Sequence, residues 1–287
     1  MKKTVITADS GVIISDKRIP IIPLFIIDHD TGKTYRDQDD ITIEEVYALR
    51  LEGHRITTSC VNLAEAEDHF RKQLEEADQI VHLCMSSKIS EGSLVAVNQA
   101  AAEVAPDRIR IVNTLQGPAG GAIIARKAMQ MIEQEDNLDA IAQYLCERIV
   151  PHVKTSFIVP DPAGYKISGK GILNGFINLG LSAFSAGSGI PAIRFTSGGS
   201  MLPIRKIRAA RDRNMYVEFF KGLYDPALME ENFIAVSSLA PEPERLEALR
   251  EYIEALPDTE SYFDTMGTTI SAFACRDSLG ISYLGKA

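Results

Sequence analysis

Two short hydroxyl-rich segments have the residue types to bind an anion together. Thr57-Thr58-Ser59 ends an extended segment, and Ser86-Ser87-Lys88-Ile89-Ser90 follows a predicted strand, so both come just before predicted helices. The N-terminus of a helix offers free backbone N–H groups and a dipole that favours negative charge, and the hydroxyls add further donors. If the two segments are neighbours in the fold, they form one anion site. The alternative is that these side chains only cap helices and form turns, as Ser and Thr commonly do.

A glycine-rich segment, Gly117 to Gly121, follows another predicted strand and could cradle a phosphate group. It matches neither of the common phosphate-binding patterns, G-x-x-x-x-G-K-[ST] and G-x-G-x-x-G. We therefore favour a tight start of a helix with close backbone packing, and we predict no cofactor.

Metal and nucleophile chemistry has less support in the sequence. Asp28-His29-Asp30 resembles a metal cluster, but Thr31-Gly32-Lys33 follows between two extended runs, which is typical of a hairpin turn. We therefore predict no metal site. The other histidines have no Asp or Ser partner at a motif spacing, so no catalytic triad is predicted. An enzyme that uses Ser90, Asp9 or Cys60 on a phosphorylated or acyl substrate is the alternative to a binding protein.

A basic run lies in the second half of this acidic chain. Five cationic side chains, among them Arg205, Lys206 and Arg208, fall within residues 205–213. The run predicts a docking face for an acidic protein surface or a phosphorylated head group. The alternative is a solvated helix whose charges improve solubility.

The composition is that of an ordinary globular protein, with 287 residues, 45% hydrophobic residues and a net charge of -9. Because nucleic-acid recognition draws on basic surface, a nucleic-acid partner is disfavoured. The four cysteines form no C-x-x-C pair, which favours a reducing cytoplasm. The most apolar stretch, Ile172 to Phe195, is interrupted by Asn, Gly and Pro, so no stable membrane insertion is expected.

The first half of the chain alternates short β-branched runs with amphipathic helical patterns, which predicts βαβ units and a parallel sheet. The predicted strands are Val5–Ala8, Ile21–Ile27, Gln79–Leu83 and Ile109–Val112. The predicted helices follow Thr42, Asn62 (or Ser59), Ser90, Gly117 and Asn137, and Thr42 with Glu45 forms a capping box. Function is expected at the strand ends, where the binding loops of open α/β sheets gather.

The second half has hairpin-like runs instead. They are Ala192–Phe195 with Met201–Ile204, Phe233–Ser237, and Thr268–Ala274 with Gly280–Leu284. We therefore predict two domains, an N-terminal parallel-sheet α/β domain over residues 1-155 and a C-terminal α+β domain with an antiparallel sheet over residues 156-287.

The order of these motifs resembles that of the DegV family over nearly the whole chain. The motifs that carry the resemblance are Ala8-Asp9-Ser10, Lys33-Thr34-Tyr35-Arg36-Asp37, Asp40-Ile41-Thr42, the two hydroxyl segments, Lys170-Gly171-Ile172, Pro203-Ile204-Arg205-Lys206-Ile207-Arg208 and Leu279-Gly280. The chain departs from the family pattern at Cys60-Val61-Asn62, at Glu91 in place of Gly, and at Phe273 in place of His.

The resemblance implies a DegV-like two-domain fold that holds one long-chain fatty acid between the domains and has no catalytic residue of its own. It implies that Thr58, Ser59 and Ser90 bind the carboxylate, and that Ile172 to Ile190 and strands near Phe273 line the tail. Some members of the family present the acid to a separate fatty acid kinase, which is therefore a candidate partner. The further residues expected near the head group are Asp9, Ser87, Gly120 and Phe273.

Overall fold

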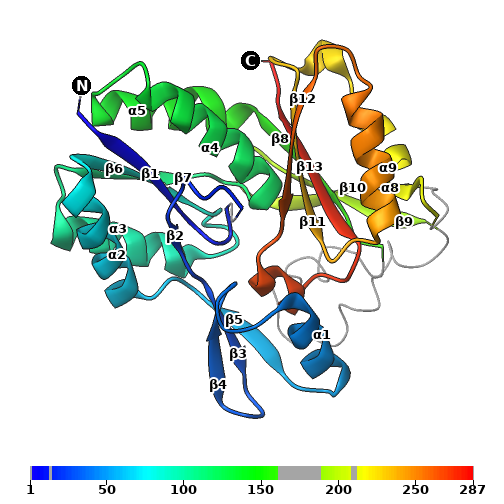
Figure 1. Ribbon diagram of the computed structural model, residues 1–287, viewed down its shortest axis with the longest axis horizontal. Helices are drawn as coiled ribbons and strands as arrows, with labels where there is room; N and C mark the ends of the chain where they lie inside the picture. The colour runs from blue at the N-terminus through cyan, green and yellow to red at the C-terminus, as the bar shows by residue number, and fades with distance from the viewer. Residues whose placement is uncertain (1, 13–14, 161–188, 208–211, 287) are drawn as a thin grey trace.

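The computed structural model describes residues 2–286 except 13–14, 161–188 and 208–211. Helix α4 (Pro118–Ile132) lies between a four-stranded sheet, in the order β2-β1-β6-β7, and a six-stranded sheet, in the order β10-β9-β8-β13-β11-β12 (Figure 1). A third, three-stranded sheet has the order β4-β3-β5. The strands are β1 (Thr4–Asp9), β2 (Ile21–Ile22), β3 (Phe25–Asp28), β4 (Lys33–Arg36), β5 (Ile56–Ser59), β6 (Gln79–Cys84), β7 (Ile109–Asn113), β8 (Val153–Ile158), β9 (Ile190–Phe195), β10 (Met201–Ile207), β11 (Phe233–Leu239), β12 (Glu260–Thr265) and β13 (Ser278–Leu284).

The helices cover the sheets and connect them. The remaining α-helices are α1 (Ile43–Leu51), α2 (Leu63–Glu76), α3 (Glu91–Val104), α5 (Leu138–Tyr144), α8 (Met215–Lys221) and α9 (Pro243–Glu254). The shorter helical turns are the π-helix η1 (Leu145–Ile149) and the 3-10 helices η2 (Val150–His152), η5 (Pro226–Leu228) and η6 (Thr268–Ala272).

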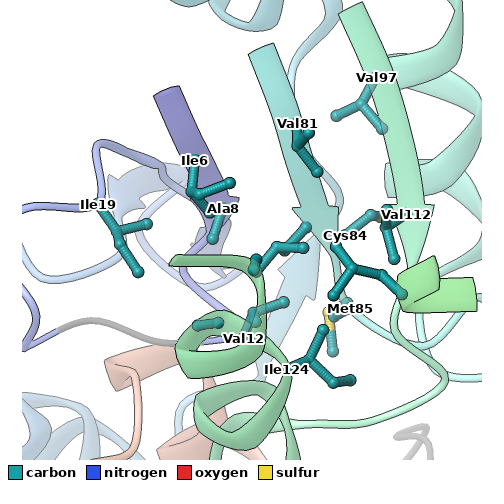
Figure 2. Packing of buried hydrophobic residues seen from close by; sticks show 14 of the residues in the cluster. Ile6, Ala8, Val12, Ile19, Val81, Cys84, Met85, Val97, Val112 and Ile124 are labelled. Atoms are coloured by element: carbon teal, nitrogen blue, oxygen red, sulfur yellow. The ribbon is translucent and has the colours of Figure 1, made fainter. Parts of the chain in front are cut away.

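The predicted parallel sheet is confirmed. β1 pairs in parallel with β2 and β6, and β6 pairs in parallel with β7. All six residues of β6 are buried, as expected for a strand covered on both faces by helices. Ile124 of α4 packs near Val12, Cys84 and Met85 at the carboxyl end of this sheet (Figure 2).

The predicted strand Ile21–Ile27 is wrong as a single strand. β2 joins the parallel sheet, whereas β3 pairs antiparallel with β4 and β5 in the small sheet. Pro23 separates the two strands, and proline has no N–H for a sheet hydrogen bond. The chain therefore leaves one sheet at this point and starts another. The hairpin turn after Asp28 is confirmed, because Asp28 pairs with Lys33.

The six-stranded sheet is antiparallel except for one parallel pair, β11 with β12. β8 crosses the predicted domain boundary after residue 155 and pairs with β9 and β13, both in this sheet. The division of the chain into residues 1-155 and 156-287 stays a prediction.

The predicted hairpin of Thr268–Ala274 with Gly280–Leu284 is wrong. Residues Thr268–Ala272 form η6, and β13 pairs instead with β8 and β11. The hydroxyl and backbone N–H of Thr269 both donate to Asp37, 2.7 and 3.2 Å away, and these hydrogen bonds compete with strand pairing.

The first turn of α4 is the tight helix start that the glycines predicted. A Cβ atom on Gly121 would lie 2.4 Å from the carbonyl oxygen of Val12, and one on Gly120 would lie 2.6 Å from both Gln116 Oε1 and Thr155 Oγ1. The helix therefore approaches the backbone after β1 and the strand β8 more closely than any side chain would allow.

We expect Gly121→Ala to lower the free energy of unfolding by about 1–3 kcal/mol, because the backbone of Val12 cannot move aside as a flexible side chain would. Urea unfolding measures this loss. Gly198→Ala is the matched control, since the nearest atom to its added Cβ is 3.8 Å away. Equal stability of the two variants would contradict the close contact.

Candidate functional site

The two hydroxyl segments meet in one cavity, here called the hydroxyl cavity. Thr58 and Ser59 reach it from the end of β5, and Ser90 reaches it from the residue before α3. Its empty volume is about 710 Å³, part of it open to solvent. The lining residues are Leu24, Thr58, Ser59, Cys60, Met85, Ile89, Ser90, Thr269, Ile270 and Phe273.

The hydroxyl of Ser90 is available to a ligand. Its Oγ lies 2.7 Å from Ser93 Oγ, which is buried and accepts a hydrogen bond from Val61 N–H at 3.2 Å. The buried Ser93 hydrogen needs an acceptor, and Ser90 Oγ is the one that the described residues offer it. Either hydroxyl can donate in this pair, and when Ser93 donates to Ser90, the hydrogen of Ser90 is left for the cavity.

The capping interpretation of the hydroxyl segments is wrong at these positions. Ser90 precedes α3 but its side chain makes no capping hydrogen bond, and α2 is capped by Asn62, whose Oδ1 accepts from Glu65 N–H. The backbone N–H groups in the first turn of α3 have no partner within the helix. The hydroxyl cavity therefore lies next to a helix N-terminus, where the dipole favours negative charge.

An apolar cavity continues from the hydroxyl cavity. Met85, Ile89, Ile270 and Phe273 line both, so these four side chains form the junction. The apolar cavity has an empty volume of about 780 Å³, part of it open. The rest of its lining comes from the start of α4, the strands β8, β9 and β10, the segments around η6, and the first residue of β13: Gly117, Pro118, Phe157, Ile158, Val159, Ile193, Phe195, Met201, Met266, Ala274 and Ser278.

Phe273 therefore lies where a head-group residue was expected, but as an apolar wall between the two cavities. The stretch Ile172 to Ile190 was expected to line the tail. Its residues 172–188 lie outside the described part of the chain, and so does the motif Lys170-Gly171-Ile172. Glu91 is exposed and is not among the described residues that line either cavity.

Asp9 does not line the hydroxyl cavity, but its carboxylate holds the backbone of Met85, which does. Its buried carboxylate accepts hydrogen bonds from the N–H groups of Met85 at 2.9 Å and Gly11 at 3.0 Å. Burial raises the pKa of Asp9 to about 6, although the two N–H donors act to lower it. The carboxylate thus fixes the backbone of Met85, a residue of the junction.

Asp37 joins three distant segments at the cavity. Its buried carboxylate accepts from Ser10 Oγ at 2.7 Å, from Gln38 Nε2 at 3.1 Å, and from both the hydroxyl and the N–H of Thr269. η6 is held a second time by Arg50, whose guanidinium donates to the carbonyl oxygens of Ser271 and Ala274. These contacts place Ile270 and Phe273 at the junction.

Sequence reasoning missed Thr269, Asp37 and Arg50 as residues that build the site. Asp37 was noticed only within the motif Lys33-Thr34-Tyr35-Arg36-Asp37, and Thr269 was placed in a strand. An acidic residue at the end of a short polar strand was the available signal, but its partner is 232 residues away.

Two other predicted residues are near the site but outside its lining. Ser87 Oγ accepts from Asn113 Nδ2 at 2.8 Å, and Asn113 Oδ1 accepts from Ser87 N–H at 3.2 Å. Gly120 is buried in the first turn of α4, where it packs closely. Both shape the loops behind the cavity.

The basic run begins in a strand, so the solvated-helix alternative is wrong for its first part. Arg205 and Lys206 belong to β10, and Arg208 lies outside the described residues. β10 is an edge strand of the six-stranded sheet. The docking role of the three residues stays a prediction.

Asp28, Asp30 and His54 place ligand atoms within 4.8 Å of one another and could hold a metal ion. The same atoms have structural partners: Asp28 accepts from Thr31 and contacts His54 Nδ1 at 2.9 Å, and Asp30 accepts from Arg55 N–H. Asp28 and Asp30 belong to the hairpin turn, and His54 contacts Asp28 from the segment after α1.

No helix in the described part of the chain has the length and apolar character needed to span a bilayer.

Comparison with known proteins identifies relatives of the whole fold. The family model described as "Uncharacterised protein, DegV family" matches residues 3–286. A DegV domain-containing protein of Caldanaerobacter subterraneus is 26% identical over 188 residues, 62% of this chain and 66% of that protein. The alignment thus spans just under two thirds of this relative's length.

Two solved structures share the fold. A DegV family protein of Thermus thermophilus that binds fatty acid has a TM-score of 0.80 at 22% identity, covering 99% of this chain and 100% of that one. DegV of Bacillus subtilis, a fatty acid binding protein, has a TM-score of 0.79 at 21% identity, covering 100% of both chains. The α/β fold predicted from the sequence is confirmed by these similarities.

The raised pKa of Asp9 predicts a pH dependence of stability. A carboxyl whose pKa is higher in the folded than in the unfolded chain stabilises the fold below about pH 4, and this contribution is lost as the pH rises through about 6. The unfolding free energy of the wild type minus that of Asp9→Asn should therefore fall by about 3 kcal/mol between about pH 4 and about pH 7. Chemical unfolding of both proteins across this range measures the difference. A difference that stays constant or rises with pH would contradict the burial of a titrating Asp9.

Proposed function

Since the chain belongs to the DegV family, we propose that it binds a long-chain fatty acid, with the carboxylate at Thr58, Ser59 and Ser90 and the tail in the apolar cavity. The observation that carries the proposal is the junction of the two cavities. One is lined by hydroxyls beside a helix N-terminus, and the other is almost entirely apolar. A ligand with one anionic end and one long apolar end fits this pair.

The related proteins of Thermus thermophilus and Bacillus subtilis bind fatty acids, which supports the same ligand class here. Their low identity to this chain leaves the head-group residues to be argued from this structure. Thr58 and Ser59 have no hydrogen-bond partner for their hydroxyls among the described side chains, and the hydroxyl of Ser90 can offer its hydrogen to a ligand when Ser93 is the donor of their shared hydrogen bond.

The two ends of such a ligand make different energetic contributions. Burial of a methylene contributes about 0.8 kcal/mol, so a sixteen-carbon tail offers roughly 12 kcal/mol before the costs of association. A carboxylate taken out of water is unfavourable unless several donors meet it. The tail therefore supplies most of the affinity, and the hydroxyls offset the cost of taking the carboxylate out of water.

Native mass spectrometry of the protein purified from cells tests the function directly. We expect a mass excess equal to one acyl chain, which denaturation releases and lipid analysis identifies as a fatty acid. An empty protein that also resists loading with fatty acids of every length offered would overturn the proposal.

The head-group assignment predicts that Thr58→Val with Ser90→Ala weakens fatty acid binding about a hundredfold, because each hydrogen bond to a charged group contributes about 1.5 kcal/mol or more. Displacement of a fluorescent fatty acid measures the affinity. Thr57→Val is the matched control, since the Thr57 hydroxyl contacts His29 Nε2 at 2.8 Å and is not among the cavity-lining residues. Equal affinities of the double variant and the control would remove Thr58 and Ser90 from the site.

We also propose that the bound acid is presented to a separate kinase in the cytoplasm, which docks at Arg205, Lys206 and Arg208. The hydroxyl cavity is open to solvent, so a carboxylate at Ser90 is within reach of a second protein.

Among the described residues that line the hydroxyl cavity there is no histidine, lysine or carboxylate side chain to act as a base. Binding is therefore better supported than chemistry by Ser90, Asp9 or Cys60.

A further inference from the structure

Gly280 lies beneath an aromatic ring of the apolar cavity. It is the direct cross-strand partner of Phe157, on the antiparallel strands β13 and β8. A Cβ atom on Gly280 would lie 2.4 Å from Phe157 Cε1 and 2.8 Å from Cδ1. The ring therefore lies across the space that any other residue at position 280 would fill, an arrangement known for aromatic and glycine pairs in sheets.

The backbone under the ring has no freedom to move away. Gly280 pairs with Phe157 on one side and with Ser237 of β11 on the other, in the interior of the six-stranded sheet. A side chain at Gly280 would therefore displace the ring and not the strand. Phe195 already packs edge-on against the ring, with centroids 5.5 Å apart, so the unfilled space beside it is the cavity.

Phe157 belongs to the part of the apolar cavity farther from the hydroxyls. Phe157, Ile193, Phe195 and Met201 line the apolar cavity but not the hydroxyl cavity, whereas Met85, Ile89, Ile270 and Phe273 line both. If the Phe157 ring were displaced into the apolar cavity, the space for a tail would therefore become shorter, and the head-group end would stay unchanged.

We propose that Gly280 is a specificity-determining residue that sets the length of acyl chain the protein accepts. Because glycine has no Cβ, the Phe157 ring can occupy the space above residue 280 and does not extend further into the apolar cavity. The inference rests on the proposed function, since it takes the apolar cavity to hold the tail. The ligand class it names is long-chain acids, as opposed to medium-chain acids that would not reach Phe157.

Gly280→Ala is expected to weaken binding in proportion to chain length. Each methylene that loses its place in the cavity lowers the affinity about fourfold. We expect acids of about ten carbons to bind the variant as they bind the wild type, and acids of about sixteen and eighteen carbons to lose tenfold or more. Displacement of a fluorescent fatty acid by the saturated series from about ten to about eighteen carbons measures this profile.

Phe157→Val provides the rescue, because valine lacks the ring atoms that the new Cβ would meet. Gly280→Ala with Phe157→Val should bind long acids as Phe157→Val alone binds them, so that the loss caused by the new Cβ disappears when the ring is absent. Gly198→Ala is the control for a glycine substitution without a close contact. If Gly280→Ala does not fold, Phe157→Trp in the wild-type background tests the same point, since a larger ring should give the same length-dependent loss.

An equal loss for all chain lengths in Gly280→Ala, or no loss at all, would overturn the role of Gly280, as would failure of Phe157→Val to rescue. A change in affinity that is the same at every chain length in Phe157→Trp would also overturn the proposal. These outcomes differ from failure of the proposed function, in which the wild type itself binds no acid of any length.

Discussion

The buried carboxylate of Asp37 is the interaction on which the rest of the site depends. It accepts hydrogen bonds from Ser10 after β1, from the adjacent Gln38, and from Thr269 of η6. A carboxylate out of water is unfavourable unless donors surround it, so the three segments must come together for the chain to bury Asp37. Once they do, η6 faces the hydroxyl segments, and Phe273 and Ile270 separate the polar from the apolar cavity.

Part of the hydroxyl side of the site could be predicted from local sequence. Ser90 follows a strand of the parallel sheet and precedes a helix, and in an open α/β sheet such loops gather at the carboxyl ends of strands. Thr58 lies in β5 of the small antiparallel sheet, to which this rule does not apply. The composition of the two segments then suggested an anion. What the pattern could not distinguish was a capping hydroxyl from a free one. That depended on Asn62, which caps α2 in place of Ser59, and on Ser93, whose hydroxyl contacts that of Ser90 while Ser90 makes no capping hydrogen bond to α3.

The errors in the predicted fold occur where long-range contacts override a local pattern. Ile21–Ile27 is apolar enough for one strand, but Pro23 interrupts it and the two parts enter different sheets. Thr268–Ala274 has the β-branched residues of a strand, but the Thr269 hydroxyl and N–H bind Asp37, far away in the sequence. The parallel sheet was predicted correctly because short β-branched runs alternate with amphipathic helical patterns in the first half of the chain, and this alternation is itself a local property of the sequence.

In the proposed function, recognition of the head group and selection of the tail length belong to different parts of the fold. The hydroxyls belong to loops next to the parallel sheet and to β5, whereas Phe157 and Gly280 lie in the interior of the six-stranded sheet. Hydrogen bonds to a carboxylate depend on direction and are lost with small displacements, but apolar contacts to a chain are numerous, weak and additive. A change on the floor of the apolar cavity can therefore alter the preferred chain length while the donors at Thr58 and Ser90 keep their geometry. Met85 is the exception, because Asp9 fixes its backbone while its side chain lines both cavities, so a change there would affect both ends of the proposed ligand.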